Sequence, residues 1–161
     1  GQSAIRKIEL NTAKILKQEN NTQEIFGEGL CLYNDHLYQL SWKEGKIFKY
    51  SINNLSKVNT FEQPTKEGWG CTSDGVSIIV SDGSSTIHFI NPSSMKITST
   101  ITVREGFNNI SMLNELEWIN GDIWANVWQT DDIIVINPNN GIVKQRFNFS
   151  KLKRTLKDLI N

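Results

Sequence analysis

The sequence has few of the residues that usually bind a metal ion. It contains only two cysteines, Cys31 and Cys71, and two histidines, His36 and His88. None of the four lies at the short spacing that is typical of zinc ligands. The sequence therefore argues against a zinc hydrolase of the usual kind.

An excess of one charge and a long apolar run are also missing. The formal net charge is zero and neither half has a basic block, so nothing indicates a nucleic-acid or membrane-surface partner. No stretch approaches the ~20 apolar residues of a membrane helix, and no signal peptide is visible at Gly1. At 161 residues, the chain is long enough for one domain with a core.

Four sequons of the form N-x-S/T are present, at Asn20, Asn54, Asn109 and Asn148. In a chain this rich in Asn and Ser, chance alone accounts for most of them. They become candidate glycosylation sites only if other observations place the protein in the secretory pathway.

Short strand signals are found along most of the chain. Each is bounded by Gly, Asn, Asp or Pro, and most alternate apolar with polar residues: "HLYQLSW", "GKIFKYSI", "VSIIVSD", "STIHFINP", "GDIWANVW" and "DIIVINP". One good helical stretch follows at the end, "SKLKRTLKDLIN". There we expect Ser150 to cap a short C-terminal helix with Leu152, Leu156 and Leu159 on one face.

The strand signals repeat as a set. Aligning "KIFKYSINNLSKV", "TIHFINPSSMKIT" and "DIIVINPNNGIVK" superimposes Ile47, Ile87 and Ile133, which are 40 and 46 residues apart, and Ile5 lies 42 residues before Ile47. A period of about 40–45 residues with four short strands per unit is typical of a β-propeller blade. A β-sandwich is the alternative, but its strands do not normally repeat in sequence.

We therefore predict an all-β propeller domain over residues 1–161. The chain begins inside one blade, passes through roughly three full blades and ends in a helix. A closed ring needs at least four blades, and closure is what removes exposed strand edges. The sequence is thus expected to be part of a longer propeller.

The repeat places the unusual residues in two registers. Glu28, Gly68 and Asn114 share one register, and Trp42, Asp82 and Trp128 share the other, each with spacings of 40 and 46 residues. Trp69 directly follows Gly68. Equivalent positions of a propeller lie at one radius and one height, so these side chains are expected to gather around one mostly aromatic site.

Each of these residues also has a purely structural interpretation. Asp82 in "SDGS" fits a turn former, and Glu28 and Asn114 fit caps on loop backbone. Trp118 and Trp124 lie out of register, so we expect them in the core. Cys31 and Cys71 are expected to be small buried apolar residues rather than a disulfide.

Glu115 and Glu117 have the spacing of an acid/base pair. Alternation in "NELEW" puts both on the same face of the strand, so one of them also fits an acid that is solvated or bonded to a loop.

Five motifs, in order, resemble the plant-type (also bacterial) glutaminyl cyclases: "FGEGL", "LYQLSW", "GWGCTSDG", "SDGSS" and "LNELEWINGDIWANVWQTD". The resemblance covers nearly the whole chain. It implies a five-bladed β-propeller that converts the N-terminal glutamine of a peptide or protein into pyroglutamate and releases ammonia. Such an enzyme is a glutaminyl-peptide cyclotransferase, an aminoacyltransferase.

The resemblance also implies roles for six residues. Glu28 matches the general acid/base of the family and Asn114 its polar substrate-binding residue. The aromatic wall of the substrate site is matched by Trp42, Trp69 and Trp128, with Phe26 as an apolar neighbour of the acid.

Two segments of the family are not matched in this sequence. One is an N-terminal segment like "FTQGL", and the other is a C-terminal segment like "GKLWP" that bears an active-site lysine. These segments would supply the strands that close the ring. They are expected as a further part of the propeller, or as a separate piece that partners this chain.

The resemblance implies no cofactor for catalysis, no metal ligands and a secretory or extracellular location, and it leaves a structural cation open. Two rival functions remain: a non-catalytic propeller that binds peptide N-termini, and a protein-interaction module that uses the aromatic rim.

Cyclisation of glutamine needs a group that moves a proton between two nitrogens. Glu28 can do this if its pKa is well above that of an ordinary glutamate, and burial beside Phe26 and the tryptophans would raise it. We expect the two glycines of "FGEGL" to let this strand end approach the substrate backbone.

Overall fold

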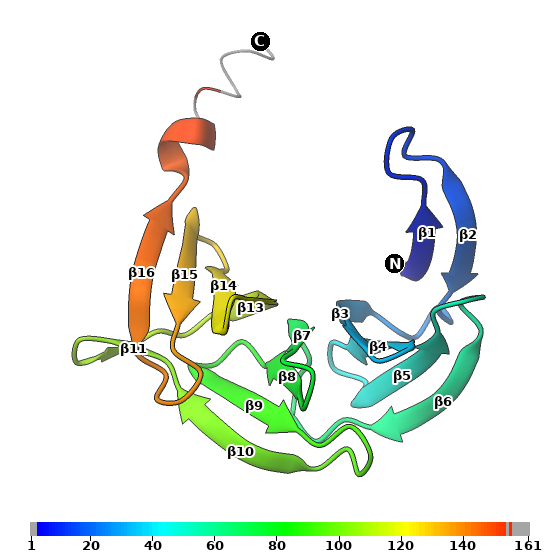
Figure 1. Ribbon diagram of the computed structural model, residues 1–161, viewed down its shortest axis with the longest axis horizontal. Helices are drawn as coiled ribbons and strands as arrows, with labels where there is room; N and C mark the ends of the chain where they lie inside the picture. The colour runs from blue at the N-terminus through cyan, green and yellow to red at the C-terminus, as the bar shows by residue number, and fades with distance from the viewer. Residues whose placement is uncertain (1–2, 154, 156–161) are drawn as a thin grey trace.

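The computed structural model describes residues 3–153 and 155 and consists of antiparallel β-sheets (Figure 1). In this part of the chain, three sheets have four strands and two sheets have two strands. The all-β prediction is therefore confirmed.

The four-stranded sheets follow one another in the sequence. The first contains β3 (Gly27–Tyr33), β4 (His36–Ser41), β5 (Lys46–Ser51) and β6 (Lys57–Glu62). The second contains β7 (Cys71–Ser73), β8 (Ile78–Ser81), β9 (Thr86–Ile90) and β10 (Ile97–Thr102). The third contains β13 (Leu113–Ile119), β14 (Asp122–Val127), β15 (Asp132–Ile136) and β16 (Val143–Asn148).

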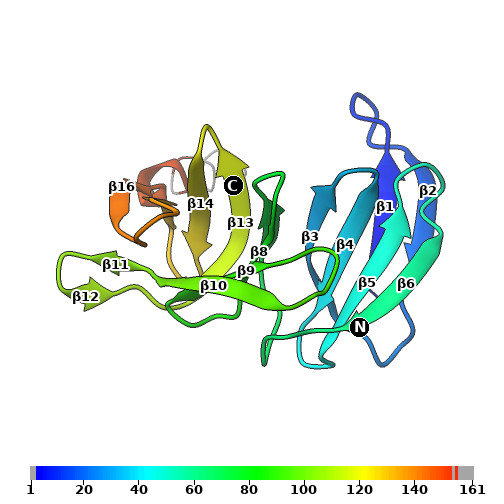
Figure 2. The same ribbon diagram turned by 60° about the horizontal axis from the view of Figure 1, so that its bottom comes forward.

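The two smaller sheets lie before and between these. β1 (Ala4–Ile8) pairs with β2 (Ile15–Asn20), and β11 (Arg104–Glu105) pairs with β12 (Asn108–Asn109). The β11–β12 ribbon projects away from the larger sheets (Figure 2), and Phe107 at its tip is fully exposed.

The sequence repeat corresponds to a repeat of strand pairing. Ile47 pairs with Phe61, Ile87 with Ile101, and Ile133 with Phe147, always between the third and fourth strands of a sheet. Ile5 in β1 pairs with Glu19 in β2 at the same offset, so β1–β2 is equivalent to the last two strands of a larger sheet. The predicted register is confirmed.

Burial differs between the strands of one sheet. In the second sheet, β8 is completely buried whereas the outermost strand β10 is almost entirely exposed. Tight turns connect neighbouring strands, as at Asn120 and Gly121 between β13 and β14. Both have positive φ, as the two-residue turn of a β-hairpin with matching twist requires.

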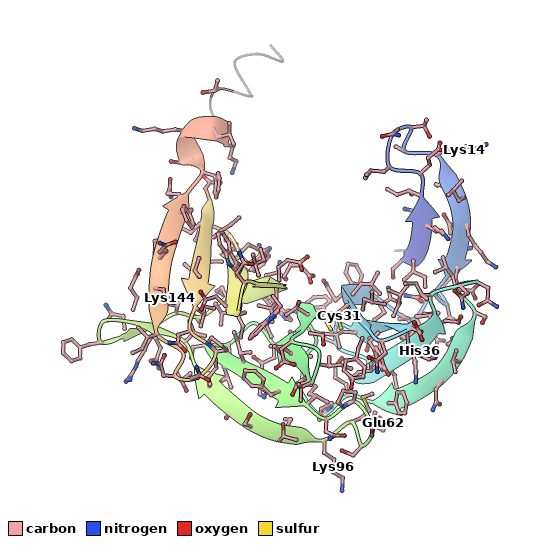
Figure 3. The ribbon with its side chains drawn as sticks, viewed as in Figure 1. Lys14, Cys31, His36, Glu62, Lys96 and Lys144 are labelled. Carbon is pink, nitrogen blue, oxygen red and sulfur yellow. The ribbon has the colours of Figure 1, made fainter. Side chains whose placement is uncertain are left out.

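The sheets are arranged along an arc (Figure 1). The hydrophobic core lies between adjacent sheets. One cluster joins β1 to the first sheet, a second joins the first and second sheets, and a third joins the second and third. The first strands of the larger sheets, β3, β7 and β13, contact one another in series. Cys31 on β3 lies near the middle of the arc, whereas Lys96 points outward from its rim (Figure 3).

Both cysteines are buried and free, as predicted. The prediction for the two tryptophans is only partly right. Trp118 is partly buried and packs against the third core cluster, but Trp124 belongs to none of the core clusters and stacks on Phe147 with ring centroids 5.5 Å apart.

The C-terminal helix begins at residue 150, and residues 150–153 are helical. The predicted cap is wrong. Ser150 lies inside the helix, and its backbone N–H donates to Oδ1 of Asn148, which caps the helix instead. Leu152 is exposed, and the predicted face at Leu156 and Leu159 lies outside the described residues. Within residues 3–153 and 155, no helix has the length and apolar character needed to cross a membrane.

Candidate active site

One pocket of about 240 Å³ is lined by all six residues that the sequence assigns to the site, namely Phe26, Glu28, Trp42, Trp69, Asn114 and Trp128. They come from all three larger sheets. Phe26 precedes β3, Glu28 lies at its start, and Trp42 follows β4. Trp69 precedes β7, Asn114 lies in β13 and Trp128 follows β14.

Two glycines explain how three sheets come so close together. A Cβ on Gly29 would lie 2.6 Å from the backbone nitrogen of Cys71, and a Cβ on Gly70 would lie 2.0 Å from the carbonyl oxygen of Asn114. No larger residue fits at either position. The two glycines therefore set the spacing between Glu28, Trp69 and Asn114.

The two glycines of "FGEGL" also have a role within the protein. Gly29 packs against backbone of the second sheet, and its N–H donates to the carbonyl of Trp69 at 2.8 Å. Gly27 faces the side chains of Gln39 and Asn21. Both glycines therefore serve contacts within the protein.

Ser81 also stabilises the contact between the second and third sheets, and nothing in the sequence pattern singled it out. Its hydroxyl donates to the carbonyl of Asn114 at 2.7 Å and accepts from the N–H of Gly70 at 2.8 Å. The side chain is completely buried. Ser81 thus holds the backbone of Asn114 in place beside the second sheet.

The aromatic residues meet edge to face around the pocket. Phe26 and Trp42 have ring centroids 5.9 Å apart, and Trp69 and Trp128 have centroids 5.5 Å apart. These are favourable geometries for aromatic pairs. Phe26 and Trp128 are both 45% exposed, so they form the outer part of the wall.

Glu28 is partly buried against this wall. Burial raises the pKa of its carboxyl group, because a low-dielectric surrounding disfavours the charged form, and the nearby carboxylate of Glu44 raises it further. Oε2 of Glu44 is itself buried, and no described residue bonds to it. The pocket thus holds a carboxyl group that keeps its proton to a higher pH than an ordinary glutamate.

Comparison with known proteins identifies the family of the chain. The sequence profile described as glutamine cyclotransferase matches residues 1–160. The chain belongs to the glutamine cyclotransferase family.

Two members of this family are similar to the chain over nearly all of its length. Glutaminyl-peptide cyclotransferase of Arabidopsis thaliana is 42% identical over 156 residues, which are 97% of this chain and 49% of that protein. The crystal structure of Myxococcus xanthus glutaminyl cyclase superimposes with a TM-score of 0.88 at 30% identity, over 96% of this chain and 66% of that one. The chain thus spans about half the length of its plant relative.

A more distant structure has the same kind of fold. Virginiamycin B lyase of Staphylococcus aureus superimposes with a TM-score of 0.60 at 17% identity, over 91% of this chain and 49% of that one. At this identity the likeness concerns the fold alone.

Glu67 is a second acid beside the pocket of this cyclotransferase-family chain. The sequence analysis did not identify it. Its Oε2 accepts hydrogen bonds from the indole Nε1 of Trp42 at 2.9 Å and of Trp69 at 3.0 Å. It has no counterpart in the two registers from which the site was predicted. Its position immediately before Gly68 and Trp69 is the one signal that could have found it.

Asp82 does not line the pocket. Its carboxylate accepts from the backbone N–H of Ser84 at 3.1 Å, as expected for a turn former, and lies 3.0 Å from Nε2 of His88. The lowered pKa of Asp82 reflects the balance between burial, which raises it, and these hydrogen bonds, which lower it. Asp82 therefore shapes the turn beside the site.

Glu115 binds backbone rather than forming an acid pair at the pocket. Its Oε1 accepts from the N–H of Cys71 at 3.2 Å and so links β13 to β7. Desolvation raises its pKa, and the carboxylates of Glu117 and Glu28 add to the increase.

The structure gives no candidate metal centre in the residues it describes. No group of three or more His, Cys, Asp or Glu side chains within residues 3–153 and 155 is arranged to hold an ion.

Proposed function

We propose that this chain carries the glutamine-binding and proton-transfer part of a glutaminyl-peptide cyclotransferase. The observation that carries the proposal is the pocket in which Glu28, with its raised pKa, and Asn114 lie among four aromatic side chains. We further propose that the three larger sheets are blades of a five-bladed propeller, of which this chain forms an incomplete part.

The substrate is an N-terminal glutamine, whose own α-amine attacks its γ-amide carbonyl. A C–N bond forms to close the ring, the bond to the amide nitrogen breaks, and ammonia leaves. Because the nucleophile is tethered to the electrophile, much of the entropic cost is already met within the substrate. The protein must fold the side chain back and move one proton.

Glu28 performs the proton transfer. Its carboxylate accepts a proton from the attacking nitrogen and gives it to the departing nitrogen, so the group ends the cycle unchanged. A raised pKa suits this exchange, since an ordinary glutamate is too weak a base at neutral pH to take the proton readily.

The other pocket residues bind and orient the substrate. The side-chain amide of Asn114 bonds the γ-amide of glutamine and fixes its plane. The aromatic wall packs against the methylene groups and excludes water. We propose that these residues act without a cofactor.

The location is a proposal that the family relationship supports. We propose a secretory or extracellular protein, and the four sequon asparagines, Asn20, Asn54, Asn109 and Asn148, are all exposed. Mass measurement before and after removal of N-linked glycans tests this part.

Ammonia release from a peptide with N-terminal glutamine tests the function. We expect release of one ammonia per pyroglutamate formed by the protein that carries this chain, and no release from a peptide with N-terminal asparagine. Binding of the glutaminyl peptide without any ammonia would contradict the enzymatic proposal and favour a non-catalytic binding module.

A further inference from the structure

Glu67 connects two sheets through a single oxygen atom. It lies in the segment between β6 and β7, and its Oε2 accepts both indole N–H groups. Trp42 directly follows β4 of the first sheet, and Trp69 lies just before β7 of the second. One carboxylate therefore fixes the rotation of two rings that different sheets contribute to the same pocket.

The two hydrogen bonds are made to a charged acceptor. The bond from Trp69 lowers the pKa of Glu67 most; the bond from Trp42 and the charges of Lys43 and Lys66 lower it further, against a partial desolvation. Hydrogen bonds to an ionised group are roughly twice as strong as neutral ones. An indole N–H is a donor only, so losing this acceptor leaves two partly buried donors without their partner.

These two rings in turn contact the other two aromatic side chains of the pocket. Trp42 lies edge to face with Phe26, and Trp69 lies edge to face with Trp128. Trp69 also packs directly against Gly83, because a Cβ there would lie 2.5 Å from Cε2 of the indole. All four aromatic residues of the pocket are thus linked to the position of Glu67.

We propose that Glu67 is a positioning residue that holds the aromatic wall in its substrate-binding arrangement. The proposal rests on the proposed function, because this wall is taken to bind the N-terminal glutamine. Glu67 is not among the residues that line the pocket, so it acts through Trp42 and Trp69.

Steady-state kinetics on glutaminyl peptide provide the first test. In Glu67→Ala, both indoles lose their acceptor, and we expect KM to rise on the order of tenfold or more. The value of kcat should stay within about threefold, since Glu28 is untouched. Glu67→Gln keeps an acceptor oxygen and should restore part of the affinity. An unchanged KM in a folded Glu67→Ala protein would overturn the proposal.

The second test does not depend on catalysis. The five tryptophans give five indole N–H signals in a ¹H–¹⁵N spectrum, and Trp→Phe variants assign them. We expect Glu67→Gln to shift the signals of Trp42 and Trp69 and to leave those of Trp118 and Trp124 in place. Glu62→Gln is the matched control, because Glu62 is an exposed glutamate that pairs with Lys46.

The two tests separate the two proposals. If the indole signals shift but no peptide is cyclised, the proposed function fails and the positioning contact stands. If Glu67→Gln leaves the signals of Trp42 and Trp69 where Glu62→Gln leaves them, Glu67 does not position the wall.

Discussion

Glu28 lines the pocket beside the aromatic wall, and Glu67 accepts hydrogen bonds from two tryptophans of that wall. Their surroundings nevertheless shift their pKa values in opposite directions. Burial and the carboxylate of Glu44 raise the pKa of Glu28. The indole of Trp69, followed by that of Trp42 and by nearby lysines, lowers the pKa of Glu67. The same side chain thus becomes a group suited to exchanging a proton in one place and a group that favours the charged form in the other.

The difference shows what decides the role of an acid near a pocket. Glu28 lies on the pocket surface and its pKa shift comes from burial and a like charge, without hydrogen bonds. Glu67 does not line the pocket, and it accepts both indole N–H groups on one oxygen. Pairs of acids whose environments separate their pKa values are a recurring sign of divided roles in active sites.

The largest expected effect separates the two acids by their influence on turnover. Glu28→Gln keeps the shape of the side chain but cannot carry a proton, so kcat should fall by roughly 10²–10⁴-fold with little change in KM. Glu67→Gln should leave kcat nearly unchanged. The measurement is ammonia release, with a melting curve for each variant. Turnover by Glu28→Gln close to that of the parent would remove the distinction.

A smaller effect is expected at the wall that Glu67 holds. Trp42→Ala and Trp69→Ala should each raise the KM for a glutaminyl peptide on the order of tenfold, because each removes a large apolar contact. Combining Glu67→Ala with Trp42→Ala should cost less than the sum of the two changes, since they remove a shared interaction. Strict additivity would mean that Glu67 acts independently of the wall.

Trp128 is a tryptophan of the wall that does not bond to Glu67, so it can be compared with Trp42 and Trp69. It contacts Trp69 through its ring edge and is 45% exposed. Trp128→Ala should raise KM as well, with little loss of stability. A Trp128→Ala protein that binds peptide like the parent but melts earlier would place this side chain in the structural framework instead.

Trp118 tests whether stability and binding are separable. It packs against the core between the second and third sheets and does not line the pocket. Trp118→Ala should lower the free energy of unfolding by about 2 kcal/mol, less than for a fully buried aromatic residue, and leave KM unchanged. Denaturant unfolding and peptide binding, both measured on Trp118→Ala, test this prediction. Weakened binding at unchanged stability would contradict it.

The pH dependence of stability gives the smallest effect. The pKa of Glu28 is raised above 4.5, so its contribution is fully present below pH 4.5 and is lost as the pH rises through the folded-state value. The pKa of Glu67 is lowered, so its contribution is present above pH 4.5 and is lost as the pH falls through the folded-state value.

Urea unfolding at a series of pH values around 4.5 should show opposite pH dependences of stability for Glu28→Gln and Glu67→Gln. Relative to the parent, Glu28→Gln should gain stability with rising pH, and Glu67→Gln should lose the contribution that the parent has above pH 4.5. The same slope in both variants would contradict the opposite shifts.

Much of the fold was predictable because its signal is periodic. Ile47, Ile87 and Ile133 repeat in sequence for the same reason that they pair at one register in three sheets. The outermost strands were harder to predict, since β10 is exposed almost throughout and its apolar residues carry no burial pattern.

The pocket residues were predictable from register and from family motifs. The residues that hold them in place were not. Ser81 and Glu67 each make two hydrogen bonds, which leave no periodic trace in the sequence. The glycines of "FGEGL" were recognised as special, yet only the spatial contact of Gly29 with the second sheet shows why. Trp124 was misplaced because register alone does not distinguish the core from a stacked pair on a sheet face.

The most direct test of this account is a ¹³C-carboxyl NMR titration of the glutamates, with the signals of Glu28 and Glu67 assigned from Glu28→Gln and Glu67→Gln. The account predicts that Glu28 titrates above 4.5 and Glu67 below 4.5 in the same folded protein. A Glu28 midpoint at or below that of Glu67 would contradict it, because the two acids would then not have the divided roles assigned to them.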